Sequence, residues 1–192
     1  MTLEIQGLGF HYKDKKIFSN LNIFFQSQAL TVIRGPSGCG KSTFLKIIAG
    51  MTKKQLGSIQ FSKPNCRIGY VHQENHLIDH WSILENLRIV TSDVKVISSW
   101  LKKFDLDLNL NSLVSQLSGG ERQRISLIRV LLQNPDVILL DEPTAHLDDK
   151  HTIQALDLIK KDFIEKLILI VSHDQRVADY ADQLLNWKKE SH

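Results

Sequence analysis

The sequence predicts an α/β fold: a mostly parallel sheet flanked by helices, an antiparallel β-subdomain at the N-terminus and an inserted α-helical subdomain. Three observations lead to this prediction. Apolar runs without alternation at 29–33, 137–140 and 167–171 indicate strands buried on both faces. Helical patterns lie between these runs, and two alternating segments precede them.

The first part of the chain is predicted to consist mainly of strands. Residues 3–10 and 20–25 alternate apolar and polar side chains, which is typical of strands with one solvated face, and 13–16 reads as a charged turn between them. The buried strand at 29–33 leads through a glycine-rich turn into a helix at 42–49, which Gly50 ends. Further short strands are expected at 58–61 and 66–71.

The middle of the chain is mainly helical in character. Ser82 and Glu85 form a possible capping box, and Asp93 is a plausible N-cap before apolar residues at helical spacing. After the strand at 137–140, a helix is expected at 152–163, and strands at 167–171 and 183–187. We therefore expect one domain over 1–192, with an α/β core of 1–73 and 133–192 and a helical subdomain of 74–132.

Composition and charge exclude several classes of protein. The chain has 192 residues, 24 Lys and Arg, 21 Asp and Glu, and a net charge of +3, which is too small to indicate nucleic-acid binding by itself. No apolar run reaches the ~18 residues that span a bilayer, and the first residues lack a signal-peptide pattern. Only Cys39 and Cys66 are present, which fits a reducing cytosol.

Gly35-Pro-Ser-Gly-Cys-Gly-Lys41-Ser42 matches the phosphate-loop pattern GxxxxGK[ST], between a predicted strand and a predicted helix. The glycines let backbone N–H groups surround phosphate oxygens, and the helix N-terminus adds partial positive charge. Lys41 would bind the β- and γ-phosphates, and Ser42 would bind Mg²⁺. The alternative is a glycine-rich turn with an incidental lysine. Cys39 reads as a small loop filler, with a reactive thiol as the alternative.

Asp141 and Glu142 follow a buried strand, where ligands of parallel sheets bind. Asp141 is expected to hold Mg²⁺ and Glu142 to polarise the attacking water; a solvated pair at a strand end is the alternative. Ser118-Gly119-Gly120-Glu121 precedes an apolar helix that Ser118 can cap, which makes a second anion site. An ordinary N-cap is the alternative there.

Together, these segments resemble the ATP-binding cassette (ABC) proteins. GPSGCGKS is similar to their Walker A motif, LSGGERQR to their signature motif and VILLDEPT to their Walker B motif. The segments around Gln73, Asp148 and His173 resemble the Q-loop, the D-loop and the switch-histidine loop. Tyr12 lies where the family has an adenine-stacking aromatic residue. The match covers essentially the whole chain in the family's order, which implies a phosphate-loop NTPase core.

The resemblance implies a role for each matching residue. Catalytic roles go to Lys41, Glu142 and His173, and Mg²⁺ ligation to Ser42, Gln73 and Asp141. The residues expected to bind ATP are Tyr12, Gly35, Pro36, Ser37, Gly38, Cys39, Gly40, Lys41, Ser42, Thr43, Gln73, Ser118, Gly119, Gly120, Glu121 and Asp148. For Tyr12 and Gln73, an exposed strand-end tyrosine and a surface loop amide are the alternatives.

The resemblance further implies an ATPase subunit that works as a head-to-tail dimer, a homodimer in the simpler case, with separate membrane permease subunits. Such a subunit would lie at the cytoplasmic face of the membrane without binding nucleic acid directly. The alternatives are a soluble ABC ATPase of a cofactor-assembly complex or, against the signature motif, a nucleotide kinase. The cargo, the direction of transport and the choice between homodimer and heterodimer stay open.

Overall fold

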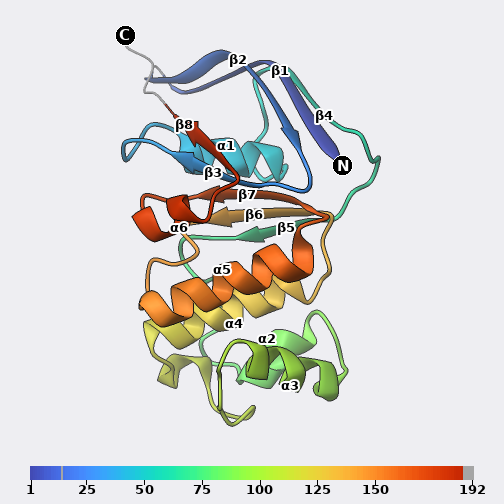
Figure 1. Cartoon of the computed structure of the whole chain (residues 1–192), viewed down its shortest axis with the longest axis vertical. Coiled ribbons are helices and arrows are strands. Elements are labelled where there is room, and N and C mark those ends of the chain that lie inside the picture. The colour runs from blue at the N-terminus through green and yellow to red at the C-terminus, as the bar shows by residue number, and fades with distance from the viewer. Residues whose placement is uncertain (14, 188–192) are drawn as a thin grey trace.

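The computed structural model describes residues 1–13 and 15–187 (Figure 1). Its first sheet is antiparallel, in the order β2-β1-β4, with β1 at Thr2–Tyr12, β2 at Lys15–Gln26 and β4 at Leu56–Phe61. This confirms the predicted antiparallel subdomain. The predicted turn at 13–16 is wrong in its second half, because Lys15 and Lys16 pair with Tyr12 and His11 and extend β2.

The second sheet is parallel throughout the described strand pairs and has the order β5-β6-β7-β3-β8. Its strands are β3 (Leu30–Arg34), β5 (Ile68–Val71), β6 (Val137–Asp141), β7 (Leu167–Val171) and β8 (Gln183–Asn186). The carboxyl ends of these strands meet at one edge. Asp141, the last residue of β6, and Ser172, which follows β7, therefore lie in the same region of the molecule.

Alternate residues of the parallel sheet enter two different cores, which explains why its strands read as continuous apolar runs. Val137 and Leu139 pack on the side of helix α1 (Lys41–Ile48) and the antiparallel sheet. Ile138 and Leu140 pack on the opposite side, which α4 (Gly119–Leu131) and α5 (Asp149–Phe163) cover. Figure 1 shows these layers from top to bottom, with α1 between the two sheets.

Two further helices lie beyond α4 and α5: α2 (Ile83–Arg88) and α3 (Val94–Lys103). The capping box of Ser82 and Glu85 and the Asp93 N-cap are confirmed. Loops and a 3₁₀ turn at Val114–Gln116 separate the helices. The sequence did not predict α6 (Gln175–Asp179), and α5 begins three residues earlier than expected because Asp148 caps it.

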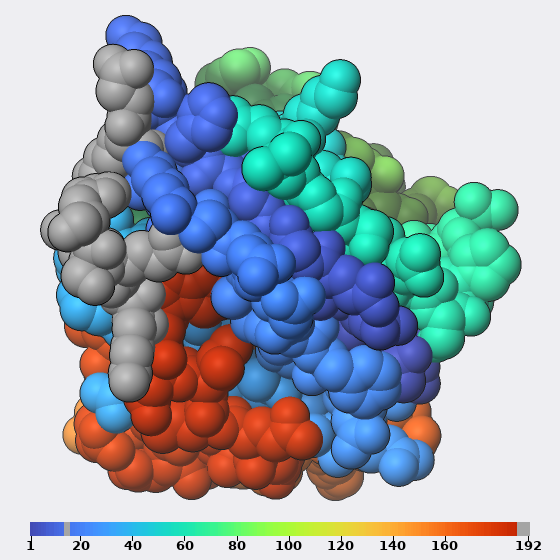
Figure 2. Space-filling model, turned by 90° about the horizontal axis from the view of Figure 1, so that it is seen from above, coloured from blue at the N-terminus to red at the C-terminus, as the bar shows by residue number. Residues whose placement is uncertain are grey.

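Aromatic side chains join the antiparallel sheet to the phosphate loop. The Trp187 ring lies 4.7 Å from that of Phe44 on α1 and 5.9 Å from that of Phe18 on β2. Trp187 lies one residue beyond β8, and its indole N–H donates to the Cys39 carbonyl (3.1 Å). This hydrogen bond ties Trp187 to the phosphate loop. Figure 2 shows the molecule from above, with the N-terminal strands in blue and the last described part of the chain in red beside them.

Candidate nucleotide-binding and hydrolysis site

The phosphate loop connects β3 to α1 and is closed around its own lysine. The Lys41 ammonium donates to the carbonyls of Gly35 (2.7 Å) and Pro36 (2.9 Å) and is largely buried. Gly40, the N-cap of α1, has φ 101°, a left-handed conformation that glycine adopts without strain. A Cβ at Gly40 would also collide with the Ile17 side chain, so the loop requires glycine there.

A cavity of about 260 Å³ opens on this loop. Its lining consists of Tyr12, Ile17, Gly38, Gly40, Lys41, Ser42 and Thr43. Tyr12 is 51% exposed and lies edge-on against Phe10, with ring centroids 4.8 Å apart. The structure therefore brings the predicted aromatic platform to the phosphate loop. Cys39 is 3% exposed, inside the core, so only its backbone can face a ligand.

The three predicted metal ligands border a second cavity of about 260 Å³. It is lined by Ser42, Lys46, His72, Gln73, Glu74, His76 and Asp141. Asp141 accepts hydrogen bonds from the Ser42 hydroxyl (2.9 Å) and the Tyr70 hydroxyl (3.1 Å). Burial, reinforced by the nearby charge of Glu142, raises the pKa of Asp141, and burial beside Asp141 likewise raises the pKa of Tyr70.

This donor set fits Mg²⁺. A hydroxyl, an amide and a carboxylate supply the oxygen ligands that this hard cation prefers, and among the described residues no cationic side chain is hydrogen-bonded to the buried Asp141 carboxylate. In the described part of the chain, no cluster of three or more His, Cys, Asp or Glu side chains is arranged to hold a metal. That finding does not conflict with a site built mainly from uncharged oxygens.

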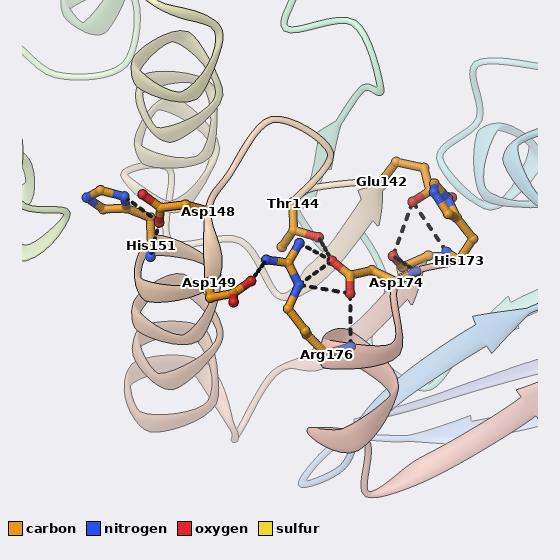
Figure 3. A network of polar contacts seen from close by, with 9 residues as sticks. Glu142, Thr144, Asp148, Asp149, His151, His173, Asp174 and Arg176 are labelled. Carbon is orange, nitrogen blue, oxygen red and sulfur yellow. Dashed lines mark hydrogen bonds and ion pairs between the residues drawn. The ribbon is translucent and has the colours of Figure 1, made fainter.

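Glu142 and His173 lie together at the ends of β6 and β7 (Figure 3). Glu142 Oε1 is 2.9 Å from His173 Nδ1, while Oε2 accepts from the Ser172 hydroxyl (3.1 Å) and the His173 backbone N–H (3.4 Å). Glu142 has φ 50°, an uncommon value for a residue with a side chain, and its own N–H donates to the Val171 carbonyl. Glu142 is 9% exposed, whereas the His173 side chain is 77% exposed and can reach a ligand.

The start of α4 is built as a reciprocal cap. Ser118 Oγ accepts from the Glu121 N–H (3.3 Å). The Glu121 carboxylate accepts from the Ser118 hydroxyl (2.7 Å) and from the Ser118 N–H (2.8 Å), and these two bonds lower the pKa of Glu121. Ser118 and Gly119 are exposed, and neither cavity at the phosphate loop is lined by residues 118–121. The structure therefore does not bring the two predicted anion sites of one chain together.

The D-loop lies against the start of α4. A Cβ on Gly119 would be 3.5 Å from the His146 ring, and one on Gly120 would be 3.0 Å from the His146 carbonyl. Asp148 caps α5 by accepting the His151 N–H (2.9 Å), and the His151 ring lies 2.8 Å from the same carboxylate. Asp148 is exposed, so it remains accessible to a second surface.

Sequence reasoning missed several polar partners of the predicted site. Tyr70 binds Asp141, and Ser172 binds Glu142. The stacked rings of His72 and His76, 4.0 Å apart, line the Gln73 cavity. Tyr70 and Ser172 each lie at the carboxyl end of a parallel strand, one residue before or after its last position. That position is the signal by which they could have been found.

Comparison with known proteins decides the family. The model of the family described as "ABC transporter" matches residues 18–145. The chain belongs to this ABC transporter family. It is 28% identical to HrtA of Staphylococcus aureus, a protein named for hemin import and ATP binding, over 94% of this chain and 92% of the relative.

Solved ABC structures have the same fold. The dimeric bacterial ABC transporter cassette MJ0796 has a TM-score of 0.87 and 28% identity, covering 97% of this chain and 94% of that one. A post-hydrolysis dimer of MJ0796, bound to ADP and phosphate, has a TM-score of 0.84 and 26% identity over the same shares. This ABC chain is accordingly the ATP-binding subunit of a transporter, and an ATPase. Within its described residues, no helix has both the length and the apolar character to cross a bilayer.

Proposed function

We propose that this ABC subunit hydrolyses Mg²⁺-ATP at two composite sites in a head-to-tail homodimer and thereby drives transport through separate membrane subunits. The observation that carries the proposal is the division of the site. The phosphate loop, Asp141, Glu142 and His173 lie together at one sheet edge. Ser118 and Gly119 of the signature motif are exposed instead, and neither lines those cavities. The dimeric state of MJ0796 supports the same arrangement.

The phosphate loop would bind ATP through its backbone, its lysine and the aromatic residue beside it. Tyr12 would stack on the adenine, and the backbone N–H groups of 37–43 would surround the phosphates. The Lys41 ammonium donates to the carbonyls of Gly35 and Pro36, which hold it at the loop. An ammonium has three N–H donors, so Lys41 would also bind the β- and γ-phosphates.

Ser42, Gln73 and Asp141 would hold Mg²⁺, which neutralises phosphate charge during transfer. Glu142 would accept the proton of the attacking water, because its carboxylate is sheltered and fixed by Ser172. His173 would stabilise the charge of the transferring phosphoryl group from its exposed position beside Glu142. The Tyr70 hydroxyl orients Asp141 from the opposite side to Ser42.

A second copy would complete each site. The N–H groups of Gly119 and Gly120, at the helix start that Ser118 and Glu121 cap, would bind the γ-phosphate that Lys41 of the other copy holds. Asp148 would cross the interface and contact the partner site. ATP then closes the dimer and its hydrolysis opens it, because the γ-phosphate joins the two surfaces.

Residues 74–132 would form the helical subdomain that transmits this closure to the membrane subunits. Its apolar residues Ile89, Val96 and Leu113 are well exposed and available for a partner. The subunit would then lie at the cytoplasmic face of the membrane. The membrane partner selects the cargo, and hemin, for which the relative HrtA is named, is the first cargo to test.

Glu142→Gln tests the proposed chemistry. We expect turnover to fall by at least about 100-fold, because an amide cannot accept the proton, while ATP binding persists and a nucleotide-bound dimer accumulates. Glu4→Gln, a change on exposed β1, is the matched control and should leave turnover unchanged. Phosphate release and size-exclusion chromatography with ATP give the two readouts. Undiminished hydrolysis by Glu142→Gln would refute the assignment.

A further inference from the structure

Arg176, in the first turn of α6, lies between three segments that border the hydrolysis site. Figure 3 shows its guanidinium between Asp174 on one side and Asp149 on the other, with the Thr144 side chain next to Asp174. Thr144 follows Glu142 by two residues, Asp174 follows His173, and Asp149 follows the D-loop residue Asp148. No family motif identified in the sequence includes Arg176.

The contact with Asp174 is bidentate. Arg176 Nε donates to both Asp174 oxygens (3.0 and 2.9 Å), and a terminal nitrogen donates to Oδ2 (2.6 Å). The other terminal nitrogen reaches Asp149 Oδ1 (2.5 Å). Asp174 Oδ2 also accepts from the Thr144 hydroxyl (3.4 Å). The guanidinium therefore joins the switch-histidine loop to the start of α5, and the Asp174 carboxylate that it binds also accepts from the Walker B loop.

Hydrogen bonds continue from Asp174 to the proposed base. The Asp174 backbone N–H donates to the Ser172 hydroxyl (3.1 Å), which in turn donates to Glu142 Oε2 (3.1 Å). Ser172 is fully buried, so water does not replace it in this path. The position of the Asp174 backbone thus helps to set where the Ser172 hydroxyl lies, and Ser172 helps to fix the Glu142 carboxylate.

The two arms of Arg176 differ in strength. The Asp174 side chain is 18% exposed and that of Arg176 33%, whereas that of Asp149 is 86% exposed. The sheltered arm lowers the pKa of Asp174, chiefly through the hydrogen bonds from Arg176. Solvent screens the Asp149 arm, so that arm can break and re-form as the D-loop moves.

We propose that Arg176 is a positioning residue for ATP hydrolysis: through Asp174 and Ser172 it holds Glu142 and His173 in register, and through Asp149 it ties them to the D-loop. The proposal rests on the proposed function, since it takes Glu142 and His173 as the catalytic pair. Arg176 itself contacts neither of them in the structure.

The test compares Arg176→Gln and Arg176→Lys in steady-state hydrolysis. We expect Arg176→Gln to lower kcat at least about tenfold, because small misplacements of a catalytic group are costly. The KM for ATP should stay within about twofold, because Arg176 does not line the phosphate-loop cavity. Arg176→Lys keeps the charge but loses the bidentate contact, so its kcat should lie between those of Arg176→Gln and the unmodified protein.

Lys150→Gln is the matched control. It breaks another exposed ion pair in the first turn of α5, that of Lys150 Nζ with Asp105 (2.6 Å), which leads away from Glu142. Its kcat should not change. A merely structural role of Arg176 predicts a lower melting temperature with no selective loss of kcat, and that result would overturn the proposal.

A double-mutant cycle adds a second readout. Ser172→Ala and Arg176→Gln interrupt the same path, so their combined effect on kcat should be clearly smaller than the product of the two single effects. Multiplicative effects would contradict the path. Glu142→Gln in the same assay separates the two claims. If Glu142→Gln is inactive but Arg176→Gln retains full kcat, only the positioning role fails, whereas an active Glu142→Gln refutes the proposed function itself.

Discussion

At the phosphate loop, the groups that would meet ATP have partners within the chain, whereas at the start of α4 they face solvent. Lys41 is bonded to two loop carbonyls, and Asp141 to Ser42 and Tyr70. Ser118 and Gly119 are exposed, although Ser118 and Glu121 cap each other. In the proposed function the first region is preformed and would bind nucleotide alone. The second region would act only when another surface brings a phosphate to it.

Gly119→Asp should have the largest effect on hydrolysis, and it should disable only the exposed start of α4. A side chain fits there, because the nearest atom to a new Cβ is 3.5 Å away, but its carboxylate would repel the γ-phosphate. We expect hydrolysis to fall by about 100-fold or more, with ATP binding at the phosphate loop retained. Gly119→Ala adds bulk without charge and should be much milder. Nucleotide titration and phosphate release measure both effects.

Tyr12→Ala should affect only the preformed region. Loss of the ring removes the stacking surface at the mouth of the phosphate-loop cavity, so the Kd for ATP should rise about tenfold. Tyr12→Phe keeps the ring and should bind nearly as well. Fluorescent-nucleotide titration gives the Kd, and equal losses in both variants would contradict the stacking role.

Asp141→Asn should separate stability from function at the preformed region. Because burial makes the ionised Asp141 costly, the amide should raise the free energy of unfolding of the nucleotide-free protein by about 1 kcal/mol. Such a gain moves the Tm of a domain of this size by roughly 2–4 °C. Ser42 and Tyr70 can still bond the amide. The same variant should lose Mg²⁺-dependent hydrolysis, and a lower Tm would contradict the cost assigned to Asp141.

Asp136 lies just before the start of β6, at the end opposite to Asp141. Asp136→Asn should have the smallest effect of these variants, and it should lower the stability that Asp141→Asn raises. Asp136 accepts from Lys63 Nζ (2.8 Å) and the Arg67 N–H (2.9 Å), which lower its pKa from 3.8. A carboxyl whose pKa is lower in the folded than in the unfolded protein stabilises the fold at pH values above its unfolded-state pKa. The contribution of Asp136 is therefore lost as the pH falls below about 4. Tm scans should therefore find Asp136→Asn slightly less stable at pH 7 and the difference gone in acid.

The sequence predicts the parts of this molecule that depend on local patterns. Buried apolar runs locate β3, β6 and β7 because both faces of the parallel sheet are covered, and the glycine spacing locates the phosphate loop. The start of β2 could not be predicted, because Lys15 and Lys16 read as a turn and pairing with β1 overrides that tendency. The short helix α6 has too few residues for a periodic signal.

Contacts between distant segments lie beyond the reach of such patterns. Tyr70 and Asp141, or Ser172 and Glu142, meet only because β5, β6 and β7 are neighbours in the sheet. Sheet order is a tertiary property. A motif therefore predicts the two carboxylates of the proposed site but not the hydroxyls of Tyr70 and Ser172 that orient them. The same limit explains why Arg176 carried no signal in the sequence.

Mixing two inactive variants tests the composite site most directly. Lys41→Ala removes the phosphate loop's charge, and Gly119→Asp disables the α4 start, so each homodimer should lack hydrolysis. In a mixed dimer, one site combines an intact loop with an intact signature. An equimolar mixture should recover roughly a quarter of the activity, since half the dimers are mixed and each has one of two sites. No recovery despite mixed-dimer formation, or full activity in either variant alone, would contradict the account.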